Sequence, residues 1–78
     1  MGGYLILARC QRDDVPMGLF ADRGTAEAVA KTITAADVSR VASEVFLMDA
    51  TGLINISVVE FLDGVPVGSD VVVDFDAD

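Results

Sequence analysis

Seventy-eight residues with a formal net charge of −8 and a mean hydropathy of +0.52 predict one small, acidic and unusually apolar domain. Five Lys and Arg against thirteen Asp and Glu are too few to neutralise phosphates, so we expect neither nucleic acid nor a membrane as partner. The chain has no His and one Cys, which excludes Ser-His and Cys-His catalytic pairs, internal disulfides and thiolate metal clusters.

The first segment predicts a hairpin. Tyr4 to Ala8 is an aromatic and branched apolar run typical of a strand. Asp13-Asp14-Val15-Pro16 then favours a reversal, because residues before proline adopt extended or turn conformations. The chain returns through Met17 to Ala21. Cys10 has apolar neighbours and is expected to be a small core residue.

Two helices are expected next. Asp22 can act as an N-cap, and the first helix carries an apolar stripe at helical spacing, formed by Ala26, Val29, Ala30 and Ile33. Thr34 with Asp37 three residues later imitates a capping box, so a second, short helix should begin there and end near Ala42.

The second half of the chain predicts three strands. The run from Glu44 to Asp49 is too uniformly apolar for a surface helix and favours a buried strand. Leu53 to Leu62 indicates a long strand, Asp63-Gly64 a tight hairpin turn, and Val65 to Phe75 the returning strand.

A short sequence occurs twice, each time after a strand-like run. Asp13 to Gly18 and Asp63 to Gly68 share the pattern Asp-x-Val-Pro-x-Gly. Proline suits the start of an edge strand and the following glycine permits a bulge, so two hairpins can arrive at this solution without a duplicated domain.

These elements predict an α+β fold with about five mostly antiparallel strands in the order ββα(α)βββ and helices packed on one face of the sheet. We expect a single domain over residues 1–78, in which residues 76–78 form a frayed acidic tail. The apolar run that begins at Tyr4 has no basic segment before it, so we expect a cytoplasmic protein without a signal peptide.

Two sets of residues are candidates for function, and no residue is expected to act as a catalyst, a cofactor ligand or a metal ligand. Short helices cannot cover both faces of so apolar a sheet, which predicts an interface on the bare face. Its candidate residues are Leu53, Val59, Phe61, Leu62, Val71 and Val73. A possible polar anchor at the first turn consists of Arg9, Arg12 and Asp14, with Arg23 as a further candidate.

We therefore expect a non-catalytic interaction or assembly module that forms a homodimer through its sheet, by the open face or by edge strands, or that binds another protein. One alternative is an acidic inhibitor or decoy that binds a basic protein surface. Another is a small dimeric enzyme or ligand-binding domain with a pocket between its subunits.

Overall fold

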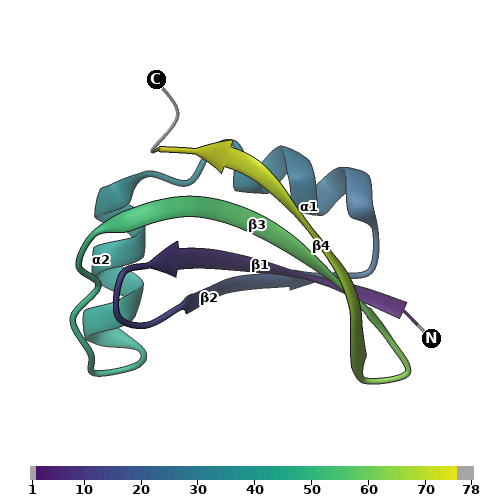
Figure 1. Cartoon of the computed structure of the whole chain (residues 1–78), viewed down its shortest axis with the longest axis horizontal. Helices are drawn as coiled ribbons and strands as arrows, with labels where there is room; N and C mark the ends of the chain where they lie inside the picture. The colour runs from purple at the N-terminus through teal and green to yellow at the C-terminus, as the bar shows by residue number, and fades with distance from the viewer. Residues whose placement is uncertain (1, 76–78) are drawn as a thin grey trace.

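The computed structural model describes residues 2–75 and shows an α+β fold with a four-stranded antiparallel sheet and two helices. In chain order the elements are β1 (Gly2–Cys10), β2 (Val15–Phe20), α1 (Arg23–Ala30), α2 (Ala35–Glu44), β3 (Leu53–Leu62) and β4 (Val65–Asp74). The order across the sheet is β2-β1-β3-β4, so β1 and β3 lie in the centre and β2 and β4 form the edges (Figure 1). The predicted α+β class and antiparallel pairing are confirmed, but the sheet has four strands instead of about five. The acidic tail predicted at residues 76–78 lies outside the described residues.

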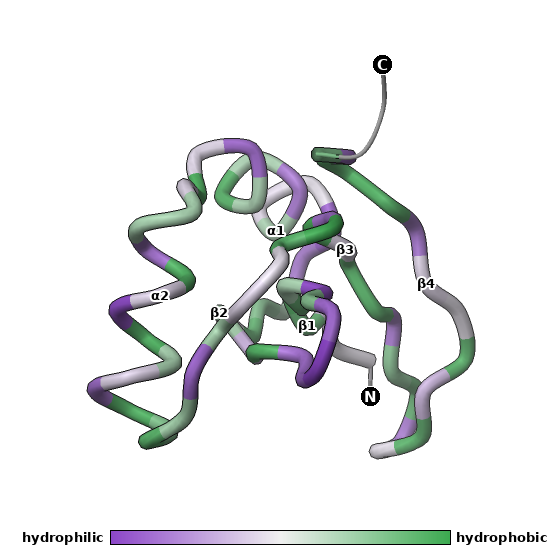
Figure 2. The backbone as a smooth tube through the Cα atoms, turned by 60° about the vertical axis from the view of Figure 1, so that its left-hand side comes forward, coloured by the Kyte–Doolittle hydropathy of each residue, from purple (hydrophilic) through white to green (hydrophobic). Residues whose placement is uncertain are grey.

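The core consists of small and branched apolar side chains from strands and helices. In β1, Ile6 and Ala8 are fully buried, and in β3, Ile56 and Val58 are fully buried, as expected for side chains that alternate along a strand. They form one cluster with Cys10, Val15, Ala26, Ala30, Val38 and Ala42. Helix α1 contacts all four strands, and the main strand contacts of α2 are with β2, beside which it lies in Figure 2.

Both helices begin at the residues that the sequence predicts. The carboxylate of Asp22 accepts hydrogen bonds from the backbone N–H and the hydroxyl of Thr25, at 2.8 and 3.0 Å. Thr34 and Asp37 form a complete capping box, in which each side chain accepts the backbone N–H of the other residue. These bonds satisfy donors that the first helical turn leaves unpaired, so the N-termini of α1 and α2 depend on local sequence.

The capping carboxylates predict a loss of stability in acid. Bonds from Thr25 lower the pKa of Asp22 below its ordinary value of 3.8, and bonds from Thr34 likewise lower the pKa of Asp37. A carboxyl pKa that is lower in the folded state stabilises the fold fully above the unfolded-state pKa, and this contribution disappears as the pH falls through the folded-state pKa.

We therefore expect the free energy of unfolding to fall below about pH 4, and to fall less steeply in a variant that combines Asp22→Ala with Asp37→Ala. Urea melts across this range measure both slopes. Equal slopes for the two proteins would contradict a role for the caps.

The hairpin turn between β3 and β4 is also confirmed. Asp63 and Gly64 both have positive φ, 52° and 82°. The type I′ turn that joins two strands by two residues requires this conformation at both positions, and Asp-Gly is among the sequences that favour it.

The first copy of the Val-Pro-x-Gly sequence builds a β-bulge in edge strand β2. Pro16 pairs with Leu7 and Gly18 pairs with Ile6, which leaves Met17 as an extra residue between two consecutive residues of β1. Proline cannot donate a backbone hydrogen bond, and an edge strand has one side on which no donor is needed.

The second copy builds the same bulge in the other edge strand. In β4, Pro66 pairs with Phe61 and Gly68 pairs with Glu60, so Val67 is the extra residue. The predicted bulge is thus confirmed in both copies, at the same place in the motif. Each edge of the sheet carries a proline and a bulge, two features that oppose pairing with a further strand.

The predicted strand between Glu44 and Asp49 is wrong. Helix α2 continues past Ala42 to Glu44. The carbonyl of Val41 accepts hydrogen bonds from the backbone N–H groups of Val45 and Phe46. Leu47 then adopts a positive φ of 54°, which turns the chain towards β3. This apolar run is therefore a helix end and a connection, and Val45, Phe46 and Leu47 are exposed.

Candidate interaction face

Side chains that alternate with the core residues project from the opposite side of the sheet, which we call the outer face. The strand register places Leu5 between Leu19 and Val59, and Leu7 between Pro16 and Ser57. The apolar rows of the outer face carry Leu5, Leu7, Pro16, Leu19, Ser57, Val59, Phe61, Pro66, Ser69 and Val71. No charged residue is in this set, and none of its apolar members belongs to the core cluster among the described residues.

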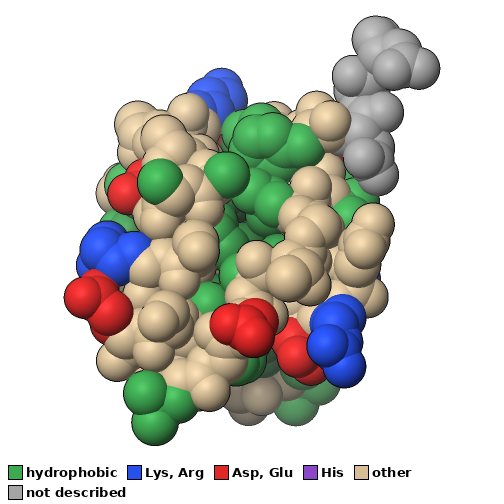
Figure 3. Space-filling model, turned by 90° about the vertical axis from the view of Figure 1, so that its left-hand side faces the viewer, with side chains coloured by type: hydrophobic (Ala, Val, Ile, Leu, Met, Phe, Trp, Pro, Cys, Tyr) green, Lys and Arg blue, Asp and Glu red, His purple; other side chains and the backbone are tan. Residues whose placement is uncertain are grey.

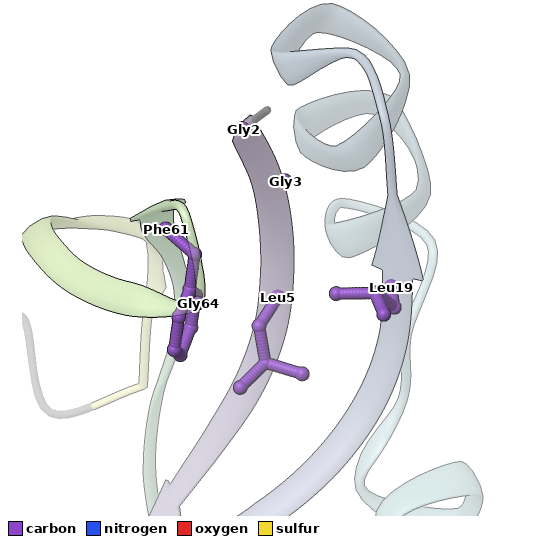
Figure 4. Close-up of a pocket in the computed structure, with 6 residues that line it drawn as sticks. All are labelled: Gly2, Gly3, Leu5, Leu19, Phe61 and Gly64. Atoms are coloured by element: carbon purple, nitrogen blue, oxygen red, sulfur yellow. The ribbon is translucent and has the colours of Figure 1, made fainter.

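The outer face has an apolar hollow at one end. Gly2, Gly3, Leu5, Leu19, Phe61 and Gly64 line a cavity of about 470 Å³. Gly3 pairs with Phe61 across β1 and β3, and its missing side chain leaves space beside the ring. In Figure 4 the side chain of Leu5 lies between Phe61 on one side and Leu19 on the other. Leu19 is 72% exposed.

The other end of the outer face is polar. Arg9 of β1 pairs with Asn55 of β3, which pairs with Asp74 of β4, so three polar residues cross the sheet in one row. The Arg9 guanidinium donates to Asp14 at 3.1 Å, and the Ser57 hydroxyl donates to Asn55 at 2.8 Å. A polar margin thus borders the apolar rows on this side.

The proposed polar anchor is only partly assembled. Arg9 and Asp14 form an ion pair with side chains 47% and 42% exposed, whereas Arg12 is exposed in the turn between β1 and β2. An ion pair this open to water contributes about 0 to 1 kcal/mol to stability.

Arg23 does not join this turn. Its guanidinium donates to Asp70 of β4 and lies 5.9 Å from the ring centroid of Tyr4 in β1. The Arg23 and Asp70 side chains are 42% and 62% exposed, so the pair ties the start of α1 to β4 at the surface.

The predicted interface residues are divided between the two sides of the sheet. Val59, Phe61 and Val71 lie on the outer face. Leu53 and Val73 instead pack partly buried against the core.

Register shifts cause this division. Leu53 pairs with Cys10, and the next residue, Ile54, has no partner in the register with β1. Val73 pairs with the core residue Ile56, and Val72 has no partner in the register with β3. Each irregularity exchanges the two faces for the residues beyond it. Leu62 lies at the end of β3 and is 54% exposed. The role of these residues in an interface remains a prediction.

Leu19 is the outer-face residue that the sequence does not indicate. Counting two residues at a time from Val15 places Leu19 on the same side as Val15, which is a core residue. The bulge at Met17 reverses this relation, and Leu19 pairs with Leu5 on the outer face. The Pro-x-Gly motif is the one sequence signal that could have shown it.

A second apolar surface lies at the end of α2. Val45, Phe46 and Leu47 are 62%, 42% and 87% exposed, and a hollow of about 310 Å³ adjoins them, lined by Ser43, Leu47, Met48 and Asp49. Figure 3 views the molecule from the side on which α2 lies in Figure 1 and shows hydrophobic side chains along the middle of that side. Glu44 and Asp49 flank this segment with negative charge.

Residues 2–75 contain no group of three His, Cys, Asp or Glu side chains placed to hold a metal ion. Burial, with smaller effects of Asp14 and Asp13, raises the pKa of the Cys10 thiol and so disfavours the reactive thiolate. No described helix is long and apolar enough to cross a membrane.

Comparison with models of protein families, with curated proteins and with solved structures found no match to this chain.

Proposed function

We propose that the protein is a non-catalytic assembly module that pairs with a second copy of itself through the outer face of its sheet. The observation that carries the proposal is a sheet face whose apolar rows cross all four strands, with the charged residues Arg9 and Asp74 confined to one end. Burying these rows removes apolar area from water without removing a charge from water.

The position of the helices supports this choice of face. We infer that both helices lie on the side opposite the outer face, because their buried residues Ala26, Ala30, Val38 and Ala42 share one cluster with the core residues of β1 and β3. That arrangement leaves the outer face without a covering layer from residues 2–75. An antiparallel sheet with two apolar faces needs a second layer on each of them.

Association by the face is favoured over association by an edge. A sheet extended through β2 or β4 would need a regular edge with free donors, and both strands contain a proline and a bulge. In β4, a second irregularity at Val72 leaves only short regular stretches between the shifts. The edges are therefore poor templates, whereas the face is continuous across four strands.

The size of the outer face suits a weak dimer. Four strands about 4.8 Å apart and seven residues at about 3.3 Å each make a face of roughly 450 Å² per subunit, or about 900 Å² in a pair. Interfaces of this size fall below the range of stable complexes and belong to the weak, transient class, so we expect a dissociation constant of micromolar order or weaker.

Sedimentation velocity from about 1 to about 100 µM tests the proposal, and we expect a species of twice the 8.2 kDa chain mass to grow with concentration. Leu5→Asp puts a charge at the centre of the face in both copies and is expected to abolish the dimer. Val67→Asp makes a comparable change at the exposed β4 bulge and should leave the dimer intact. Circular dichroism checks that both variants fold. A single 8.2 kDa species at every concentration would rule out the proposal.

Salt separates this function from that of an acidic decoy. Two subunits with a charge of −8 repel each other, so raising salt from about 0.1 to about 1 M should strengthen the dimer or leave it unchanged. Binding to a basic surface would weaken over the same range. Association that disappears in high salt would therefore favour the decoy.

A further inference from the structure

The geometry points to a specific contact within this pair: Leu19 of each subunit occupies the glycine-floored hollow on the outer face of the other subunit. This inference rests on the proposed function, because it names the residues that would make the two copies fit. Each copy contributes one projecting side chain and one hollow, the self-complementary relation that a two-fold dimer requires.

The hollow is suited to an aliphatic side chain. Its lining consists of glycine backbone, Leu5, Leu19 and Phe61, with no charged residue. A basic or acidic side chain would find no partner there, whereas an apolar one would leave water for an apolar surface. The hollow thus selects an uncharged occupant, although the chain as a whole is strongly acidic.

Leu19 is the side chain that a second copy offers at the right place. It stands at the rim of the hollow, pairs with Leu5 across β1 and β2, and is 72% exposed. Exposed leucines are common singly, but here the exposed leucine and the apolar hollow adjoin each other at the uncharged end of one face. When two such faces meet around a two-fold axis, the rim leucine of one copy and the hollow of the other form two equivalent contacts.

Removing the leucine tests the contact through its projecting side chain, which also lines the hollow of its own subunit. Leu19→Ala deletes apolar carbons from two equivalent contacts, and we expect the dissociation constant to rise about 100-fold or more. Leu47→Ala is the matched control, because Leu47 is 87% exposed and lies in the connection between α2 and β3, away from the outer face. The control should dimerise like the unchanged chain.

Filling the hollow tests the receiving half. A Cβ atom at Gly3 would meet the Phe20 carbonyl oxygen at 3.8 Å and a methyl of Leu19 at 4.0 Å, which are ordinary contacts. Gly3→Val should therefore fold at least as well as the unchanged chain, since valine favours strands. It should nevertheless raise the dissociation constant about 100-fold by taking the space of the partner's Leu19.

Gly68→Val is the control for this substitution. A Cβ at Gly68 meets no atom within 4 Å, so valine there projects into open space. We expect this variant to dimerise normally. A stable Gly3→Val subunit that no longer dimerises, beside a Gly68→Val subunit that does, would support the contact without relying on a destabilised protein.

A crosslink identifies the contact directly. In a chain whose Cys10 is replaced by alanine, subunits with Leu19→Cys are mixed with subunits carrying Phe61→Cys and oxidised. We expect the mixed disulfide to form faster than either symmetric one, because residue 19 faces residue 61 across the interface.

Two results overturn the inference, and they are distinct. If Leu5→Asp abolishes the dimer but Leu19→Ala and Gly3→Val do not weaken it, the outer face pairs and the proposed contact is wrong. If the unchanged chain never dimerises, the proposed function fails together with the contact.

Discussion

Replacing Ile56 with alanine is expected to lower the free energy of unfolding by about 2 to 5 kcal/mol. Ile56 is fully buried in central strand β3, between Ala8 of β1 and Val73 of β4. Most other buried residues are alanine and valine, so few large side chains can move to close the resulting cavity. A domain of this length has about 4 to 12 kcal/mol of total stability, and this one change removes a large share of it.

Urea melts at constant protein concentration measure the loss, because dimer formation would make stability depend on concentration. Leu47→Ala is the control here as well. With 87% of its surface exposed, Leu47 should contribute less than about 0.5 kcal/mol when truncated. If Ile56→Ala costs less than about 1 kcal/mol, the centre of the core is not where the structure places it.

Deleting Met17 is expected to destabilise the chain more than deleting Val67, although each is the extra residue of the same Pro-x-Gly bulge. Met17 is the extra residue, so without it Pro16 and Gly18 can still pair with Leu7 and Ile6, and Val15 stays on the core side. What the deletion removes is the Met17 side chain, which packs partly buried against the core, and we expect this loss to cost about 1 to 2 kcal/mol.

The corresponding deletion in β4 has little to lose. Val67 is 56% exposed and lies outside the core cluster, so we expect a cost below about 1 kcal/mol. Urea melts of the two deletion variants and amide hydrogen exchange in the two hairpins measure the difference. Equal losses would show that the packing of Met17 against the core adds nothing to stability.

Features that depend on nearby residues were predictable from the sequence. The caps at Asp22 and Thr34, the turn at Asp63-Gly64 and the two bulges are all found where the chain indicates them. In each case the determining bond or dihedral angle lies within a few residues of the side chain that favours it. The alternation of Ile56 and Val58 towards the core is equally local.

The predictions failed where the outcome depends on distant segments. The run Glu44 to Asp49 has strand composition, yet α2 continues to Glu44, the first residue of the run, and the chain then turns at Leu47. Leu53 was assigned to the same side as Val59 by alternation, and a register shift against β1 reversed it. Composition cannot show such a shift, because it depends on how two strands pair.

By itself, the sequence determined the class of the fold, the helix starts, the tight turn and the bulged edges, since these follow from hydrogen bonds and backbone preferences between near neighbours. The tertiary structure alone decided the strand order β2-β1-β3-β4, the placing of Arg23 against Tyr4 and Asp70, and the meeting of Gly3, Leu19 and Phe61 around one hollow. These depend on pairing between segments far apart in the chain, where one extra residue in a strand exchanges its buried and exposed faces.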